Sequence, residues 1–242
     1  MMDIEVRSQP MYEDGLLGKA TGGVLRPGGL VLTDQLLRMC DLPAHARILD
    51  VGCGTGSTVD HLLGDGCQAL GIDRSGSLLQ EGAASHPGLP LACGLVEYLP
   101  LASNGLDAVL AECSLSAMAD IDAALTEFHR VLRAGGCLAL SDIYARDPRG
   151  IPALRNLPLS CSLRDALTRD ELVARLQAQG FEIIAWQDHS ETLKVLAAQI
   201  ILAHGSLDEF WNRSEPAGSP NNIQAAIKQA RLGYFLMAAR TL

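Results

Sequence analysis

The side chains best suited to chemistry lie in one glycine-rich segment and in an acid that follows it. The segment is Asp50-Val-Gly52-Cys-Gly54-Thr-Gly56, and Asp73 comes seventeen residues after its last glycine. A nucleotide that lies across the ends of neighbouring strands needs backbone without side chains close by, which glycine provides. It also needs a carboxylate that accepts both ribose hydroxyl hydrogens. This spacing therefore predicts a ligand with a nucleoside part.

The glycine pattern also distinguishes between classes of nucleotide. Dinucleotide sites use Gly-x-Gly-x-x-Gly, whereas here the glycines alternate and Ser57 stands where the third glycine should be. A carboxylate such as Asp50 fits poorly beside a pyrophosphate, but it suits a ligand that carries an ammonium and a sulfonium group. An NAD-dependent oxidoreductase is therefore the weaker hypothesis.

Strands and helices must alternate to bring these residues to one edge of a sheet. The apolar run 48–51 predicts a strand that enters the glycines, and a helical pattern follows through residues 57–63. A second strand over 69–72 ends at Asp73, and Ser75 is a suitable N-cap for the next helix. These elements make one βαβ unit.

The same alternation continues along the chain. Further strands are expected at 89–93, 106–111, 137–143, 181–186 and 233–239, and further helices at 30–39, 121–132, 168–179, 193–204, 207–211 and 223–231. Gly135-Gly136 is expected to end the helix before the fifth strand, and residues 1–26 are expected to be a mobile lead-in. Parallel strands alternating with helices predict a doubly wound sheet.

Five motifs in order resemble the class I S-adenosylmethionine-dependent methyltransferases of the type 11 family. They are Ile48–Gly56, Gly71–Asp73, Glu97–Pro100, Leu106–Leu110 and Phe128–Gly136. The resemblance implies a Rossmann-like three-layer αβα sandwich with a seven-stranded, mostly parallel sheet whose last strand is antiparallel. It also implies an enzyme that transfers a methyl group from S-adenosyl-L-methionine to a small-molecule acceptor. One domain is expected, with an N-terminal cap and helix (1–44), a cofactor-binding core (45–145), and acceptor-side helices with the last two strands (146–242).

The resemblance further implies which residues hold the cofactor. The three glycines would lie against it, Asp73 would bind the ribose hydroxyls, and Asp50 would lie near the amino end. The family usually carries an acid for the adenine amino group four residues before Leu99, and Leu95 stands there instead. The expected cofactor-binding residues are Asp50, Gly52, Cys53, Gly54, Gly56, Asp73, Arg74, Val96 and Glu112.

The acceptor side cannot be read from the cofactor motif. The sulfonium is already activated, so the enzyme mainly aligns an acceptor and excludes water, and no catalytic residue is assigned. Residues 1–30, 145–165 and 190–230 are expected to cover the acceptor. Polar candidates at strand ends and in these segments are Tyr12, Glu112, Ser114, Ser116, Asp142, Tyr144, Cys161 and His189.

The seven cysteines contain no Cys-x-x-Cys pair and are interpreted as reduced thiols of a cytoplasmic protein. They raise an alternative, because relatives methylate arsenite or other thiol-bound metalloids, which requires two or three thiolates to converge. Cys67, Cys93 and Cys137 are expected in the core. Cys53, Cys113 and Cys161 remain as the set that could face one cleft, and no resident metal is expected.

Composition excludes other function classes. The chain has 242 residues, 28 acidic against 19 basic side chains and a net charge of −9, and its basic residues form no run, so nucleic acid is not an expected partner. Neither a signal peptide nor an apolar stretch of membrane-spanning length is present in the sequence. A small-molecule acceptor is expected, a homodimer is left open, and a non-catalytic S-adenosylmethionine-binding module is the alternative from another class.

Overall fold

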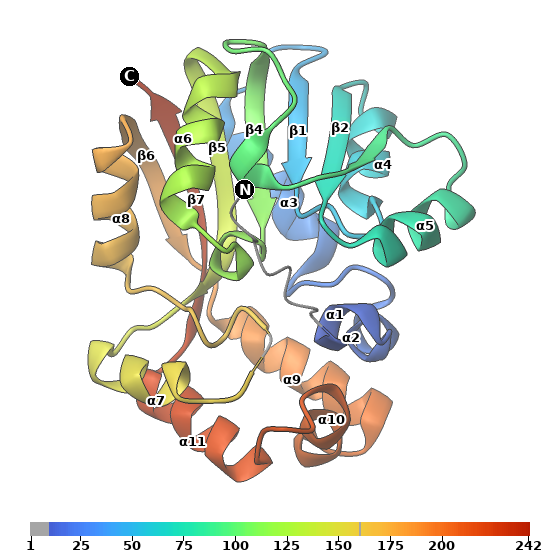
Figure 1. Ribbon diagram of the computed structural model, residues 1–242, viewed down its shortest axis with the longest axis vertical. Helices are drawn as coiled ribbons and strands as arrows, with labels where there is room; N and C mark the ends of the chain where they lie inside the picture. Colours follow the sequence, from blue (N-terminus) through green and yellow to red (C-terminus); the bar gives the residue numbers. More distant parts are fainter. Residues whose placement is uncertain (1–9, 160) are drawn as a thin grey trace, which may run out of the picture.

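A seven-stranded mixed sheet forms the centre of the computed structural model, which describes residues 10–159 and 161–242 (Figure 1). The strand order is β3-β2-β1-β4-β5-β7-β6. Strands β1 to β5 pair in parallel, and β7 runs antiparallel between β5 and β6, so the predicted fold is confirmed. The strands are β1 (Arg47–Val51), β2 (Gln68–Asp73), β3 (Leu91–Cys93), β4 (Leu106–Glu112), β5 (Leu132–Tyr144), β6 (Phe181–Asp188) and β7 (Gly233–Thr241).

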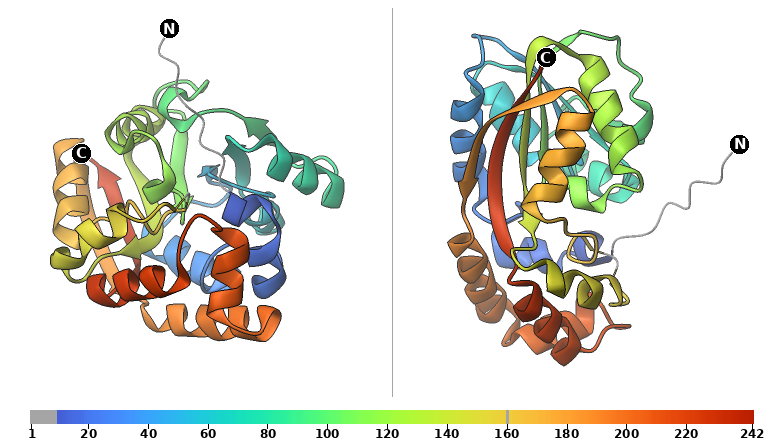
Figure 2. Two further views of the ribbon diagram at one scale, coloured as in Figure 1. Left: turned by 60° about the horizontal axis from the view of Figure 1, so that its bottom comes forward. Right: turned by 90° about the vertical axis from the view of Figure 1, so that its left-hand side faces the viewer.

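Helices cover both faces of the sheet (Figure 2). On one face, α3 (Gly29–Cys40) and α4 (Ser57–Gly64) pack into one apolar cluster, and on the other α6 (Ile121–Val131) and α8 (Arg169–Ala178) pack into a second. The central strands are buried on both sides, as Ile48–Val51 in β1 shows, which is why they are nearly continuous apolar runs. Helix α5 (Gly76–Ser85) packs beside β3 at the sheet edge.

A layer of helices lies below the carboxyl ends of the parallel strands (Figures 1 and 2). Here α2 packs against α9, and α7 packs against α11, so segments from both ends of the sequence meet. We call this layer the helical cap. Its members are α1 (Pro10–Glu13), α2 (Leu16–Thr21), α7 (Ile151–Arg155), α9 (Glu191–His204), α10 (Leu207–Ser214) and α11 (Pro220–Ala230).

Two local predictions are wrong. Residues 10–21 are not an irregular lead-in, because they form α1 and α2, and Leu16 and Leu17 are buried in the core; the predicted residues 1–9 lie outside the described part. Gly135-Gly136 does not end α6, because the helix stops at Val131 and both glycines lie within β5. Leu132 already has an extended backbone and pairs with Leu106 of β4, so sheet pairing ends the helix earlier. Within residues 10–159 and 161–242, no helix is both long and apolar enough to cross a membrane.

Candidate functional site

The glycine-rich segment forms the turn between β1 and α4. The Gly52 N–H donates to the Ile72 carbonyl at 2.8 Å, which ties the turn to the end of β2. Gly52 has a φ of +70°, and a Cβ there would lie 2.4 Å from the Cβ of Ser114. Glycine alone satisfies both conditions, so the turn lies directly against the chain that follows β4.

Asp73 ends β2 with its carboxylate held by this turn. Its Oδ2 accepts a hydrogen bond from the Gly54 N–H at 2.8 Å, and its Oδ1 accepts one from the Ser75 N–H at 2.8 Å. Burial raises the pKa of Asp73, and these two backbone hydrogen bonds oppose the rise. Because each oxygen keeps a free lone pair, the fixed carboxylate can still accept the two hydroxyl hydrogens of a ribose.

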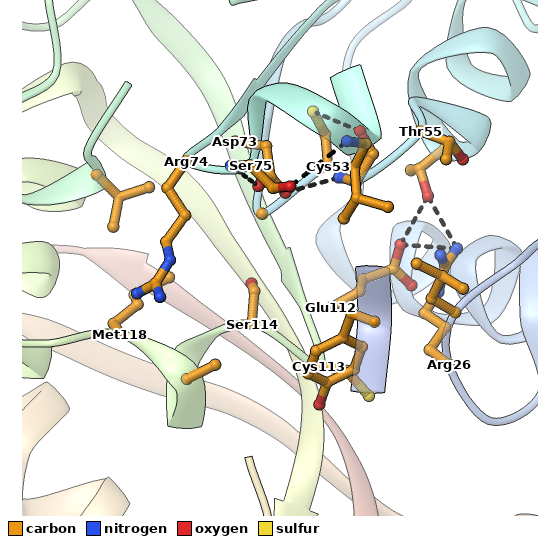
Figure 3. A pocket seen from close by; sticks show the side chains of 18 of the residues that line it. Arg26, Cys53, Thr55, Asp73, Arg74, Ser75, Glu112, Cys113, Ser114 and Met118 are labelled. Carbon is orange, nitrogen blue, oxygen red and sulfur yellow. Dashed lines mark hydrogen bonds and ion pairs between the residues drawn. The ribbon is translucent and has the colours of Figure 1, made fainter. Parts of the chain in front are cut away.

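A pocket surrounds this carboxylate (Figure 3). Its walls come from the glycine turn, from the residues after β2 and β4, and from α1 and the segment 23–26 that follows α2. Seven of the predicted cofactor-binding residues line it: Gly52, Cys53, Gly54, Asp73, Arg74, Val96 and Glu112. Asp50 and Gly56 do not line it.

Asp50 lies behind the pocket wall. Its residue is 3% exposed, and burial raises the pKa of its carboxyl well above the ordinary value. The negative charge of Glu112 adds to this rise, and the positive charge of Arg26 opposes it. Its position gives no support to direct contact with a ligand, so Asp50 is better described as part of the charged layer beneath the pocket floor.

At one end of the pocket, Glu112 and Arg26 form a buried ion pair. The Arg26 Nη2 lies 3.0 Å from the Glu112 Oε2, and their side chains are 10% and 3% exposed. Thr33 of α3 and Thr58 of α4 donate hydroxyl hydrogen bonds to the same carboxylate at 3.0 and 3.2 Å. Burial alone would lower the pKa of Arg26, but the negative charge of Glu112 raises it above its ordinary value, so the guanidinium keeps its charge.

This ion pair could not have been found from the sequence beyond Glu112 itself. Arg26, Thr33 and Thr58 come from a loop and two helices and carry no common motif. Sequence analysis left open whether Glu112 faces ligand or solvent; in the structure it lines the pocket while its carboxylate is engaged by Arg26.

At the other end of the pocket lies Arg74. The pocket lining includes the apolar residues Leu78, Leu95, Val96 and Met118, and also Glu97. Figure 3 shows the Arg74 side chain reaching from the end of β2 toward Met118. Its Nη2 is buried and has no hydrogen-bond partner among the described residues.

The side of the pocket nearest the helical cap carries Tyr12. Its hydroxyl lies 2.9 Å from the Ser162 Oγ, which joins α1 to the segment after α7. Burial raises the pKa of Tyr12 far above its ordinary value, and the nearby Cys161, Cys113 and Asp142 raise it further, so the phenol is neutral. A neutral buried phenol can orient a polar ligand group by hydrogen bonding.

Asp142, at the carboxyl end of β5, is a second carboxylate in this region. It is 3% exposed and accepts hydrogen bonds from the Ser116 hydroxyl at 2.8 Å and the Ser116 N–H at 3.0 Å. Burial raises its pKa from 3.8 to about 6, against the effect of the Ser116 and Ile143 hydrogen bonds. Ser114 and Ala117, on either side of Ser116, line the pocket, so Asp142 holds the turn that forms this wall.

The three cysteines singled out from the sequence form no common thiolate site in the described residues. Cys53 lies in the glycine turn, whereas Cys113 and Cys161 lie near Tyr12. Burial raises the pKa of each thiol, that of Cys161 to about 12, which disfavours the thiolates that a metalloid requires. In residues 10–159 and 161–242, the side chains close enough to share a metal ion are Asp34, His61 and Asp65.

The predicted burial of the other cysteines is partly wrong. Cys137 is buried and Cys67 is half-buried, but Cys93 is exposed. Cys93 ends the three-residue edge strand β3, where neighbouring elements cover little of it. All seven cysteines are free thiols.

Five of the polar candidates from the sequence do not line the pocket, namely Ser116, Asp142, Tyr144, Cys161 and His189. Ser116 and Asp142 lie behind its wall, and Tyr144 and His189 are engaged elsewhere. The Tyr144 hydroxyl donates to Asp188 at 2.7 Å, and its ring packs edge-on against Trp186. His189 is half-buried, with its Nε2 3.2 Å from the side-chain oxygen of Gln187. Neither side chain is in a position to meet a ligand in the pocket.

Comparison with known proteins shows that this chain is similar to methyltransferases. Residues 49–140 match a family model described as a methyltransferase domain. The chain is 29% identical over 227 residues to methyltransferase GfsG of Streptomyces halstedii, covering 89% of this chain and 81% of that protein. It is also 29% identical over 172 residues to demethylmenaquinone methyltransferase of Corynebacterium urealyticum, covering 62% of this chain and 74% of the relative.

One similar solved structure is described as that of a cyclase and not of a methyltransferase. The [4+2]-cyclase SpnF superposes with a TM-score of 0.77 at 29% identity, covering 96% of this chain and 94% of that one. Likeness over almost the whole length includes the helical cap as well as the sheet. The chain therefore contains a region that matches a methyltransferase domain, and its whole fold is shared with a cyclase.

Proposed function

We propose that this chain is a class I S-adenosylmethionine-dependent methyltransferase and that it methylates a hydroxyl group of an apolar small molecule bound beneath the helical cap. S-adenosyl-L-methionine is the methyl donor, and a small molecule is the acceptor. The part of this proposal that goes beyond the comparisons is the hydroxyl group as the methyl acceptor. The observation that carries it is the buried Asp142, which lies near Tyr12 on the acceptor side.

We assign the cofactor across the pocket from its residues. Asp73 would hold the ribose hydroxyls, and Gly52 and Gly54 would let the nucleoside lie against the backbone. The methionine part would extend toward Glu112 and Arg26. Support for this direction comes from the Arg26 Nε, which is buried and has no partner in the described residues, so it can bind the methionine carboxylate.

Methyl transfer to a hydroxyl requires a place for one proton. As the acceptor oxygen bonds to the methyl carbon, the carbon–sulfur bond breaks, its electron pair stays on sulfur, and the hydroxyl proton must leave. We propose that this proton passes through the Ser116 hydroxyl, while Ser116 gives its own proton to Asp142. A carboxyl with a pKa of about 6 is ionised at neutral pH and well matched to this task.

The helical cap supplies the cover that the acceptor needs. Its helices fall within the three segments that sequence analysis assigned to the acceptor (1–30, 145–165 and 190–230), of which residues 1–9 and 160 lie outside the described part, and Tyr12 brings one polar group from it into the pocket. Excluding water keeps the sulfonium from reacting with solvent and holds the acceptor close to the methyl group. The division into cap, core and acceptor-side helices remains part of this proposal.

The test is transfer of a labelled methyl group from S-adenosylmethionine to a panel of hydroquinones and other apolar molecules that carry a hydroxyl group. The acidic limb of the wild-type rate profile should have an apparent pKa of about 6, set by Asp142. Asp142→Asn should lower the rate by about 100-fold or more, as expected for loss of general base catalysis. Asp188→Asn provides the matched control, because this carboxylate accepts from the Tyr144 hydroxyl and not from Ser116, the proposed proton relay. Label found on carbon or nitrogen would contradict the hydroxyl assignment.

A second candidate reaction is [4+2] cyclisation of a polyene on the same bound cofactor. The likeness to SpnF over nearly the whole chain favours it. Mass spectrometry separates the two reactions, because methylation adds one methyl group to the acceptor whereas cyclisation leaves its mass unchanged. Retention of a substrate's mass with changed ultraviolet absorption would support the cyclase and would count against methyl transfer.

We also propose a cytoplasmic location and keep the homodimer as a hypothesis. The seven free thiols support the first, since reducing compartments keep cysteines unpaired. Fractionation of expressing cells tests the location. Sedimentation of the purified protein with and without cofactor tests the dimer.

A further inference from the structure

Arg74 is the unexplained cation of the pocket. It follows Asp73 directly and makes no ion pair or side-chain hydrogen bond among the described residues. The oxygens of the neighbouring Asp73 accept from the Gly54 and Ser75 N–H groups at 2.8 Å, and no hydrogen bond joins them to the Arg74 side chain. Figure 3 shows no interaction drawn to its guanidinium.

A buried guanidinium nitrogen without an acceptor is costly. Removing a charged donor from water without replacing its hydrogen bond is unfavourable, and native structures rarely leave such groups unmet. The Nη2 of Arg26 faces the same demand and meets it with Glu112, Thr33 and Thr58, whereas the Arg26 Nε also lacks a partner among the described residues. The Arg74 side chain lies toward Met118, and no acceptor among the described residues bonds to its Nη2. The missing acceptor must therefore come from the ligand.

The base of the cofactor is the part of the ligand that reaches this end. With the ribose on Asp73 and the methionine toward Arg26, the adenine must lie on the Arg74 side. An aliphatic side chain, Leu95, stands where the family's acid would accept from the adenine amino group, and it cannot accept a hydrogen bond. What adenine offers a donor such as Arg74 is a ring nitrogen.

We propose that Arg74 recognises the base by donating a hydrogen bond to a ring nitrogen, so that this chain binds cofactors whose purine lacks the amino group. Recognition by a donor on the enzyme replaces the usual recognition by an acceptor. The exocyclic amine then contributes little to affinity. The inference rests on the cofactor and on Asp73 as the ribose ligand, and it is independent of the proposed acceptor.

Calorimetric titration of the purified full chain tests the proposal with S-adenosylhomocysteine and its 6-deamino analogue, in which purine replaces adenine. The wild type should bind both within about threefold. Arg74→Met should weaken both by about 10- to 100-fold, the value of one charge-assisted hydrogen bond. Arg38→Met is the control for loss of one positive charge, because Arg38 is exposed on α3 and does not line the pocket.

The 1-deaza, 3-deaza and 7-deaza analogues identify the nitrogen. One of them should bind more weakly to the wild type, and that loss should vanish in Arg74→Met. Arg74→Lys should recover part of the affinity, and equal thermal midpoints without ligand would show that the variants fold.

Three outcomes would overturn the proposal. The first is unchanged affinity in Arg74→Met. The second is a deamino analogue that binds more than tenfold worse to the wild type, with the difference removed by Glu97→Gln, because Glu97 also lines the pocket and would then be the acceptor for the amine. The third is weaker binding in Arg74→Met without coupling to any deaza analogue, which would mean stacking only. A wild type that binds no S-adenosylhomocysteine would overturn the cofactor assignment itself, whereas a failure of the acceptor proposal leaves these titrations unaffected.

Discussion

The two ends of the pocket solve the same electrostatic problem in opposite ways. At the methionine end, the guanidinium of Arg26 lies 3.0 Å from Glu112 and is tied to two threonines, so its charge is neutralised within the protein. At the base end, the Nη2 of Arg74 is buried and has no partner in the part of the chain described. The charge of Arg26 is paired before the ligand arrives, with only its Nε left free, whereas the charge of Arg74 has no partner in the described residues until the ligand binds.

Because of this difference, we expect Arg26 to affect the stability of the free protein and Arg74 to affect ligand binding. A neutralised buried pair holds together the elements that supply it, here the loop before α3, the helices α3 and α4, and β4. Breaking such a pair leaves one uncompensated charge, which is strongly destabilising. An unpaired buried cation has no protein partner to lose, so its removal affects the ligand complex and not the free protein. Substitutions at the two ends should therefore have opposite signatures.

The largest effect is expected from breaking the paired end. Arg26→Met should lower the free energy of unfolding by about 3 to 5 kcal/mol, because Glu112 then remains buried without its partner. Urea unfolding of the ligand-free protein measures this change. Arg74→Met under the same conditions should leave the free energy of unfolding unchanged or raise it, since the group it removes has no hydrogen-bond partner.

A double variant sharpens the same test. Arg26→Met combined with Glu112→Gln should regain a large part of the lost stability, because the stranded charge is removed along with its partner. Additive losses in the double variant would mean that the two side chains contribute separately. The ends of the pocket would then differ less than their contacts suggest.

Asp142 extends the comparison to a buried carboxylate without an ionic partner. Its pKa is raised from 3.8 to about 6, so the folded protein holds this proton more tightly than the unfolded chain. As pH rises from about 4 to about 6, the unfolded chain loses the proton first and the free energy of unfolding falls by about 3 kcal/mol on account of this group. Above that range both states are ionised and no further change follows. Unfolding titrations at pH 4 and pH 7 should show the decline in the wild type relative to Asp142→Asn.

Asp73 is intermediate between Arg26 and Arg74. Its carboxylate accepts hydrogen bonds from two backbone N–H groups, and it can still accept hydrogen bonds from a ligand. Asp73→Ala should weaken binding of S-adenosylhomocysteine by about 1 to 3 kcal/mol, because a charged acceptor for the ribose hydroxyls is lost. Calorimetric titration measures the loss. Unchanged affinity would contradict the placement of the ribose, and with it the assignment of the two ends.

The sequence predicted the sheet well because its signals are local. Apolar runs ending in glycine or aspartate placed β1 and β2, and the Thr168–Glu171 capping box placed the start of α8, where both hydrogen bonds of the box form. The cap helices α1 and α2 were missed because glycines interrupt them. Their stability comes from burying Leu16 and Leu17 against distant segments, which no local pattern reports.

In the candidate site, too, the residues set by local spacing could be predicted, and those that act through distant partners could not. Glycine spacing and Asp73 could be read directly, because a tight turn and a ribose ligand each demand one residue type at one position. Arg26 and Ser162 could not, since each matters through a partner far away in the sequence, Glu112 and Tyr12 respectively. The unpaired state of Arg74 is a property of three-dimensional surroundings and has no sequence signal at all.

The smallest effect is expected at Tyr12, which resembles the paired end because its hydroxyl already has a partner. Tyr12→Phe removes the hydrogen bond to Ser162, 2.9 Å away, and should lower the free energy of unfolding by about 1 kcal/mol. Ser162→Ala removes the same hydrogen bond from the other side. If the two hydroxyls bond only to each other, the double variant should lower the free energy of unfolding by little more than either single variant. A further loss of methyl transfer in Tyr12→Phe, with unchanged cofactor affinity and no such loss in Ser162→Ala, would show that the phenol also orients the acceptor. Tyr12 would then belong with Arg74, among the polar groups that the ligand completes.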